Sequence, residues 1–292
     1  MFHIISDSCV DLPNDVVNAL SVQILPLKVK VQGKEYNNFL DHREINPQDF
    51  YQLLRNKETA TTSQANPQEC IDIMEPLLAQ GDDVLFIVFS SQLSSTYNSC
   101  LIAQKTLQEQ YPDRKIIVLD SLCASMGQGM LVYKAAKLKE NGHTIDEVAE
   151  YVENTKKDIS HLFTVSDLGH LKRGGRLSNA SFILGTLINI KPLLHVSIDG
   201  KLKVYGKARG RFKSLNALVN RMVETFDKER NDIVFISHGD NLQDALYVKK
   251  VIMEKLDLNE DQFLINEIGP VIGAHSGVDT LAIFYVGNER TH

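Results

Sequence analysis

The 292-residue sequence lacks the long apolar runs that mark membrane and secreted proteins. No stretch approaches the roughly 20 apolar residues that a membrane-spanning helix needs. Asp7 and Asp11 interrupt the N-terminal segment that a signal peptide would keep apolar. We therefore expect a cytoplasmic protein without integral membrane association.

Cysteine is scarce, and no pair has the CxxC spacing of metal or redox sites. The four cysteines all fall in the first half of the chain, a pattern typical of reduced cytosolic thiols. The sequence therefore predicts no structural zinc site. The residues are Cys9, Cys70, Cys100 and Cys123.

The short motifs of common catalytic classes are also missing. There is no GxxxxGK[ST] phosphate loop, no GxGxxG dinucleotide motif, no HExxH zinc motif and no GxSxG nucleophile motif. The simplest evidence for nucleotide-dependent or hydrolytic chemistry is therefore absent.

Basic residues are concentrated in one stretch of an acidic chain. The net charge of −6 argues against general nucleic-acid binding. Residues 170–213, however, hold many basic side chains opposed only by Asp199, which suggests a local anionic partner such as a phosphate group or an acidic protein face. The alternative is a solvated surface. The basic residues are Lys172, Arg173, Arg176, Lys191, Lys201, Lys203, Lys207, Arg209, Arg211 and Lys213.

The first half alternates short apolar runs with helical patterns. Residues 2–6, 84–89 and 116–119 are typical of buried strands. Asn46-Pro47 and Asn66-Pro67 have the pattern of a helix cap followed by proline in the first turn, and Thr144 with Glu147 forms a capping box. This alternation predicts a mostly parallel sheet covered by helices.

The second half predicts an α+β arrangement, with a boundary near Lys157 that divides the chain into residues 1–157 and 158–292. Asp199-Gly200 predicts a hairpin turn between two of its strands. Long helices are expected over residues 211–226 and 242–256. The predicted strands cover residues 162–165, 193–198, 201–205, 233–237, 263–267 and 281–286.

Hydroxyl-rich loops are predicted at the carboxyl ends of strands, where α/β sheets bind ligands. They comprise Asp7-Ser8, residues 61–64 and residues 90–96. A helix beginning near Ser94 would add free amide groups that suit a small anion such as a carboxylate. The alternative is that these residues only cap helices and form turns.

Two glycine-rich segments supply further candidates. His275 is expected in a loop among Gly269, Gly273 and Gly277, where the backbone can approach a ligand closely. In the other segment, Gly174-Gly175 precedes Arg176, whose guanidinium suits phosphate oxygens. An ordinary helix C-cap is the alternative for these two glycines.

Taken together, these motifs resemble the signatures of the DegV family over essentially the whole chain. They lie at residues 2–8, 11–13, 62–64, 90–99, 120–121, 174–176 and 273–275, in the family's order. The resemblance implies an α/β fold of two domains: an N-terminal mostly parallel sheet flanked by helices, a C-terminal α+β domain, and a ligand tunnel between them.

The resemblance also implies a function. Characterised members are the fatty-acid-binding subunits of bacterial fatty acid kinase, which bury the acyl chain and present the carboxylate to a separate kinase subunit that resembles dihydroxyacetone kinases. Carried over to this chain, Thr62, Ser94 (or Ser95) and His275 would hold the carboxylate. Arg176 and Arg209 would face the kinase and support phosphoryl transfer, and their loss should impair phosphorylation while leaving lipid binding nearly intact.

The remaining implications concern partners and chemistry. This chain would bind no cofactor or metal itself and would not be an enzyme, because the partner brings ATP and magnesium. The acyl phosphate would serve phospholipid synthesis, with transient contact to a membrane acyltransferase. Two positions depart from the family pattern: Gly277-Val278-Asp279 replaces a Gly-Pro-Gly turn, and Ala65 replaces a common proline. We expect the Asp279 carboxylate to pair with an arginine.

Three other functions remain open from the residues alone. A serine hydrolase or acyltransferase would use a serine nucleophile, His275 as base and Asp7 or Asp120 to orient it. A nucleic-acid binder would use the basic stretch, although few aromatic residues interleave the charges. A carrier for another apolar acid has the same sequence requirements as a fatty-acid carrier.

Overall fold

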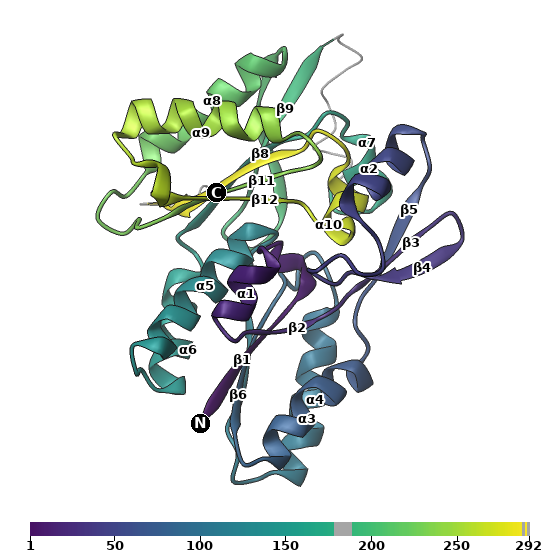
Figure 1. Cartoon of the computed structure of the whole chain (residues 1–292), viewed down its shortest axis with the longest axis vertical. Helices are drawn as coiled ribbons and strands as arrows, with labels where there is room; N and C mark the ends of the chain where they lie inside the picture. Colours follow the sequence, from purple (N-terminus) through teal and green to yellow (C-terminus); the bar gives the residue numbers. More distant parts are fainter. Residues whose placement is uncertain (178–188, 288–289, 291–292) are drawn as a thin grey trace.

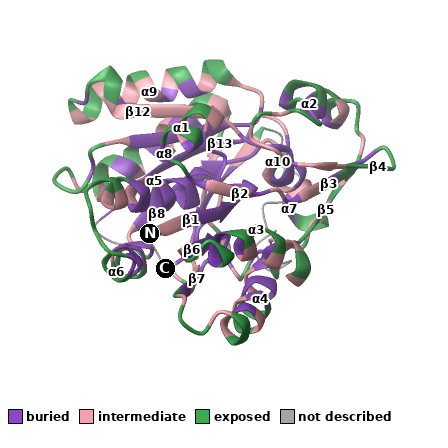
Figure 2. Ribbon diagram, turned by 60° about the horizontal axis from the view of Figure 1, so that its bottom comes forward, coloured by how far each residue is buried: buried purple, intermediate pink, exposed green. Residues whose placement is uncertain are grey.

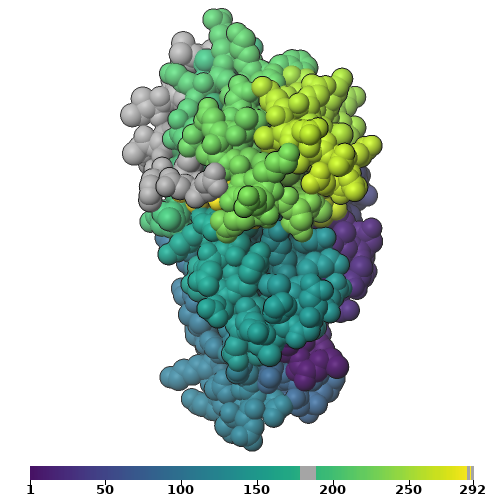
Figure 3. Space-filling model, turned by 90° about the vertical axis from the view of Figure 1, so that its left-hand side faces the viewer, coloured from purple at the N-terminus to yellow at the C-terminus, as the bar shows by residue number. Residues whose placement is uncertain are grey.

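The computed structural model describes residues 1–177, 189–287 and 290, and Figure 1 shows their arrangement. Three sheets and their covering helices form the molecule. Figure 3 shows the N-terminal half, purple to teal, stacked against the C-terminal half, green to yellow.

The first main sheet is parallel throughout, as predicted. Its strands run in the order β2-β1-β6-β7. Leu85 and Ile87 of β6 face one layer of helices while Val84, Phe86 and Val88 face the other, which explains why the strand is apolar without interruption. The strands are β1 (Phe2–Asp7), β2 (Gln23–Leu25), β6 (Asp83–Val88) and β7 (Ile116–Asp120).

Helices cover both faces of this sheet. The caps predicted at Asn66 and Thr144 are confirmed as capping boxes with Glu69 and Glu147. Helices α3 and α4 lie on one face, and α5 and α6 lie on the other. The elements are the 3-10 turn η1 (Ser8–Val10), α1 (Asn14–Ala19), α3 (Pro67–Ala79), α4 (Thr96–Gln110), α5 (Met126–Glu140) and α6 (Ile145–Thr155).

A small antiparallel sheet that the sequence did not predict projects from this half. It has the order β4-β3-β5, with strands β3 (Lys28–Val31), β4 (Lys34–Asn37) and β5 (Ala60–Ser63). Helix α2 (Pro47–Arg55), capped by Asn46 as predicted, lies between β4 and β5 in the sequence. The expectation that residues 61–64 form a loop at the end of a parallel strand is therefore wrong, because residues 61–63 belong to β5.

The second main sheet is mixed and has the order β10-β9-β8-β13-β11-β12. Only β11 and β12 pair in parallel, and Gly200, at φ +83°, turns the predicted hairpin between β9 and β10. Figure 2 shows β1 and β13 buried within the molecule and the outer face of α9 exposed. The strands are β8 (Ile159–Thr164), β9 (Ile190–Val196), β10 (Leu202–Arg209), β11 (Val234–His238), β12 (Phe263–Glu267) and β13 (Leu281–Val286).

One face of the second main sheet carries the predicted long helices, α8 (Arg211–Thr225) and α9 (Leu242–Leu256). The described part of this half also contains the short elements α7 (Gly169–Arg173), the 3-10 turn η3 (Glu260–Gln262) and α10 (Pro270–Ser276). The α/β class predicted from the sequence is confirmed.

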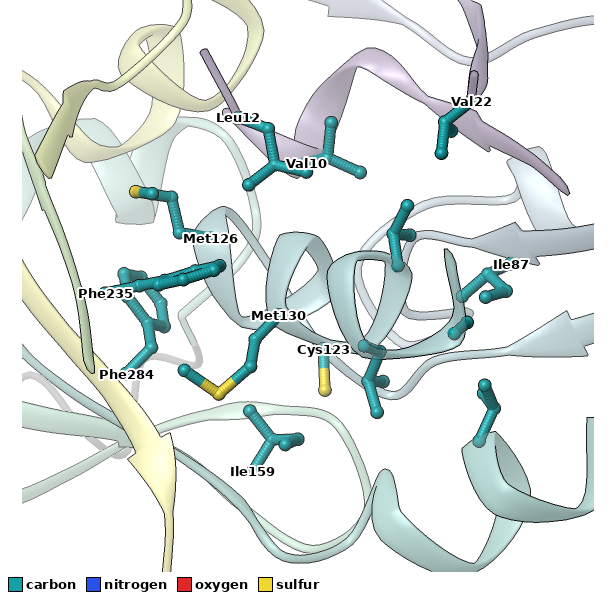
Figure 4. Close-up of a cluster of buried hydrophobic side chains, with 14 of the residues drawn as sticks. Val10, Leu12, Val22, Ile87, Cys123, Met126, Met130, Ile159, Phe235 and Phe284 are labelled. Carbon is teal, nitrogen blue, oxygen red and sulfur yellow. The ribbon is translucent and has the colours of Figure 1, made fainter. Parts of the chain in front are cut away.

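Helix α5 lies between the two main sheets and packs against both. Figure 4 shows Met126 and Met130 of this helix beside Phe235 and Phe284 of the second main sheet, with Leu12 on the opposite side. The predicted division near Lys157 falls in the connection between α6 and β8, yet this core is continuous across it.

Candidate functional site

A narrow cavity lies where the two main sheets and the small sheet meet. It contains about 830 Å³ of space between atoms, including space open to solvent. Its mainly apolar walls are typical of small-molecule sites. The walls include Phe89, Leu93, Phe163, Val196, Ile272 and Phe284.

Thr62 and His275 meet at this cavity although 213 positions separate them in the sequence. Thr62 Oγ1 and His275 Nε2 are 2.8 Å apart. Thr62 is placed by β5, and His275 lies in α10, which has Pro270 in its first turn and ends at Gly277. The predicted loop around His275 is therefore wrong, since the residue lies in the last turn of a short helix.

Two glycines fit α7 and α10 tightly together. A Cβ atom on Gly174 would lie 2.1 Å from His275 Nδ1, and one on Gly277 would lie 2.7 Å from His170 Cδ2. Gly174 also directly follows α7 as its C-cap, so the helix-cap explanation of this glycine holds as well. The His275 ring thus fills the space beside Gly174, and the His170 ring fills the space beside Gly277, so neither position has room for a side chain.

His275 is a neutral group at physiological pH. Burial, and then the nearby charges of Arg176 and His170, lower the pKa of the imidazole from 6.5 to about 4. Its Nδ1 atom is buried and has no hydrogen-bond partner within the described part of the chain. The mouth therefore offers an uncharged ring beside the Thr62 hydroxyl.

Ser94 lines the cavity from the connection between β6 and α4. Its Oγ accepts from the Thr96 amide at 3.2 Å and lies 3.0 Å from Thr96 Oγ1. Thr96 Oγ1 also accepts from the Ala65 amide at 3.3 Å, which joins this connection to the segment after β5. Among the described residues that line the cavity, Ser94 appears and its neighbour Ser95 does not.

The two predicted arginines occupy different environments. Arg176 lines the cavity, where its Nε donates to the Leu93 carbonyl at 3.0 Å and its Nη1 donates to the Gly174 carbonyl. It therefore connects the segment before Ser94 to the residue packed on His275. Arg209 is an exposed side chain at the end of β10, opposite Ile190.

The two departures from the family pattern are accommodated locally. Asp279 adopts φ +59°, a conformation that aspartate tolerates better than most residues. Its carboxylate accepts from Asn241 Nδ2 at 3.2 Å, so the expected arginine pairing is wrong within the described part of the chain. Ala65 is buried and donates its amide to Thr96, a bond that a proline could not make.

The carboxylates proposed for a hydrolase do not serve His275. Asp7 accepts from the amides of Cys9 and Phe89 at 3.0 and 2.8 Å. Asp120 accepts from the amides of Ser91 and Leu122 at 3.1 and 3.0 Å. Both carboxylates hold connections after strands, and within the described ranges no acid orients His275 as the acid of a catalytic triad would.

The basic stretch is divided among several contacts. Arg211 Nε donates to Asp244 at 2.6 Å, Lys191 Nζ donates to Ser166, and Lys201 pairs with Asp199 at 3.1 Å. Lys172, Arg173, Lys207 and Lys213 are exposed. Part of the basic stretch is therefore paired with acidic or hydroxyl groups of the chain itself, and part of it is exposed.

The four cysteines are free and buried, and Cys70 Sγ lies 3.3 Å from Cys100 Sγ. In the described residues no cluster of His, Cys, Asp or Glu has the arrangement of a metal site. None of the helices in the described ranges combines the length and the apolarity needed to span a membrane.

Sequence reasoning missed two of the residues that line the cavity, Ser125 and Ser237. Ser125 had a usable signal, because it follows a predicted strand and precedes a helix, where ligand-facing residues gather. Ser237 had none. Thr96, Gly174 and Ser276 lie in segments that the sequence singled out, but their contacts with Ser94, with His275 and with the cavity could not be predicted.

The similarities to known proteins agree with this architecture. A profile described as an uncharacterised protein of the DegV family matches residues 1–288. A DegV domain-containing protein of Clostridium perfringens is 40% identical over 289 residues, which cover 99% of this chain and 98% of that protein.

Two solved structures are similar over nearly their whole length. A fatty-acid-binding DegV family protein from Thermus thermophilus has 30% identity and a TM-score of 0.85, covering 97% of this chain and 98% of that one. A stearic-acid-binding protein from Eubacterium ventriosum has 25% identity and a TM-score of 0.87, with 98% coverage of both chains. The chain belongs to the DegV family.

Proposed function

We propose that this protein is a cytoplasmic carrier that buries one long-chain fatty acid and presents its carboxylate to a separate ATP-dependent kinase. The observation that carries the proposal is the cavity itself, which is apolar along its walls and polar where Thr62, Ser94 and His275 border it. The fatty acids bound by the similar Thermus and Eubacterium proteins support the same ligand class.

The acyl chain supplies most of the binding energy in this proposal. About fifteen methylene-type carbons at roughly 0.8 kcal/mol each give on the order of 12 kcal/mol before ordering costs. A narrow apolar cavity recovers this energy without any ion pair. Another apolar acid of similar shape remains the alternative ligand.

The polar mouth suits a carboxylate that must stay reactive. Hydroxyls and a neutral imidazole can orient a carboxylate oxygen by hydrogen bonds. A cation paired with the carboxylate would instead neutralise its charge and weaken it as a nucleophile. The Arg176 guanidinium donates to two backbone carbonyl groups. In this proposal its positive charge acts on the carboxylate from nearby, without a direct ion pair. Phosphoryl transfer depends on such positioning and on charge stabilisation.

The partner completes the chemistry. A dihydroxyacetone-kinase-like subunit would bring ATP and magnesium, and the product would be an acyl phosphate for phospholipid synthesis. Arg209 is exposed on β10, where a docked protein can reach it. The narrow cavity would protect the mixed anhydride by excluding water.

Lipid analysis of the purified protein tests the carrier role. The protein is denatured and extracted with organic solvent, and the extract is analysed by mass spectrometry. We expect one long-chain acid per chain, and delipidated protein should take up added oleate. A protein that carries no acyl ligand and also fails to take up oleate would disprove the proposal.

A reconstituted reaction tests the kinase role. Loaded protein, the candidate kinase subunit and magnesium ATP are mixed, and acyl phosphate is trapped with hydroxylamine. The hydroxamate should appear only when both proteins are present. Ester turnover by this chain alone, abolished in Ser94→Ala, would instead support the hydrolase.

A further inference from the structure

A second set of hydroxyls lines the cavity, in addition to those proposed to hold the carboxylate. Ser125 precedes α5, Ser237 lies near the end of β11, and Ser276 ends α10. All three line the cavity, and none is more than 6% exposed. Hydroxyls are unexpected in an apolar lining unless each one has a hydrogen-bond partner.

Two of these hydroxyls belong to a chain that begins at a buried carboxyl group. Ser125 Oγ donates to Asp11 Oδ2 at 2.6 Å and lies 3.2 Å from Ser237 Oγ. Asp11 Oδ1 accepts from the Gly269 amide at 3.0 Å. Ser237 is therefore the member of this chain that can still bond to a molecule in the cavity.

The bond to Asp11 sets the direction of this chain. Because the Ser125 hydroxyl donates its proton to the Asp11 carboxyl group, the Ser125 oxygen can accept from the Ser237 hydroxyl. The Ser237 oxygen is then available to accept a hydrogen bond from a molecule in the cavity.

The backbone of Ser125 is held in an uncommon conformation. Its φ of 52° and ψ of −143° are rare outside glycine, and its side chain does not cap α5. The hydroxyl points to Asp11 instead of bonding to the amides of the first turn. The fold thus keeps this serine at the cavity wall at the expense of a good helix cap.

Ser276 provides the observation that points to a ligand. Its Oγ is buried and has no hydrogen-bond partner within the described part of the chain, although the residue lines the cavity. A buried hydroxyl without a partner is unfavourable. Thr280, another lining residue, shows the contrast, because its Oγ1 is 3.0 Å from the Ser276 carbonyl and 2.9 Å from the Gly277 carbonyl.

We infer that Ser125, Ser237 and Ser276 form a second polar subsite that binds a hydroxyl group carried on the acyl chain. A hydroxyl both donates and accepts, which matches an acceptor oxygen at Ser237 and an unpartnered hydroxyl at Ser276. The inference rests on the proposed function and narrows it, since the ligand class becomes hydroxylated long-chain acids.

Competition between matched acids tests the subsite. Delipidated full-length protein is mixed with stearic acid and one octadecanoic acid that carries a single hydroxyl, and the bound ratio is read by native mass spectrometry. The hydroxyl is moved along the chain in successive experiments, and keto acids form a parallel series. One hydroxyl position should bind about tenfold more tightly than stearic acid, the value of roughly one good buried hydrogen bond.

Two variants then test whether this preference depends on Ser237 and Ser276. Ser276→Ala and Ser237→Ala should each bring the ratio close to one. Ser214→Ala is the matched control, because Ser214 is also fully buried but its hydroxyl bonds to the Arg211 carbonyl on α8, and it should keep the preference. Thermal melts confirm that each variant is folded.

The outcomes are distinguishable. If stearic acid binds but no hydroxylated isomer is preferred, or if the preference survives in both serine variants, the subsite is disproved while the carrier role stands. If only a water molecule satisfies Ser276, the keto and hydroxy series will both bind no better than stearic acid, which also disproves it. Failure of every acid to bind would disprove the proposed function and, with it, the subsite.

Discussion

The two walls of the cavity mouth are built by different physical means. Thr62 and Ser94 stand on a wall joined by hydrogen bonds, in which Thr96 connects the two segments. His275 stands on a wall defined by close packing, because Gly174 leaves no room for a further atom. Single hydrogen bonds contribute about 1 kcal/mol each, whereas a steric overlap displaces the whole segment. The wall that carries His275 should therefore tolerate substitution less well than the wall that carries Thr62 and Ser94.

Gly174→Ala should give the largest effect. The added methyl group would overlap the His275 ring and force α7 and α10 apart, at a cost on the order of 1–3 kcal/mol, or roughly five- to 150-fold in fatty-acid affinity. Isothermal titration calorimetry with oleate measures this affinity. Gly206→Ala is the control, because its new Cβ would come no closer than 3.4 Å to Leu193. Equal affinities for both variants would show that the packing is unimportant.

Arg176→Ala should come next and should differ from Arg209→Ala. The sequence alone predicted that neither change weakens lipid binding much. The bonds from Arg176 to Leu93 and Gly174 now predict a loss of about tenfold in affinity, because both walls lose their connection. Arg209→Ala should bind oleate normally, and both variants should form less acyl phosphate. Indistinguishable oleate affinities for the two variants would contradict the bridging role.

Substitutions in the wall that carries Thr62 and Ser94 should reduce oleate affinity less. Thr62→Val keeps the shape of the side chain and removes the group that meets His275, so we expect about a fivefold loss of oleate affinity. Ser95→Ala should change nothing measurable, since Ser95 is not part of the lining among the described residues. An effect of Ser95→Ala as large as that of Thr62→Val would reassign the carboxylate site.

A separate effect, on stability and not on affinity, is a pH dependence. The pKa of His275 is about 4 in the folded protein and 6.5 without the fold, so the unfolded chain binds more protons between these values. The contribution of His275 to stability is complete above pH 6.5 and is lost as the pH falls toward 4. Urea unfolding at pH 7 and pH 5 should show less loss of stability for His275→Gln than for the natural chain. Identical losses would mean that His275 is not held neutral by the fold.

The sequence predicted which residues line the cavity better than it predicted their local structure. Thr62, Ser94 and His275 were predicted from residue type and family resemblance and all line one cavity, yet Thr62 lies in a strand and His275 in a helix. Short β-rich runs such as residues 60–63 carry little periodic signal, so the small sheet was missed. Gly174 could be read only as a turn or cap, because its contact with His275 depends on pairing between distant segments. Such tertiary contacts leave no local pattern.

The position of α5 has a consequence for the integrity of the molecule. Its apolar side chains are covered on both sides, and Met126, Met130 and Leu131 have no exposed surface. A fragment that ends at residue 157 would expose the Met126 and Met130 side of this helix, and the remaining fragment would lose the helix beneath its sheet. We therefore expect calorimetry to show one cooperative melting transition, and neither fragment to be soluble when produced separately.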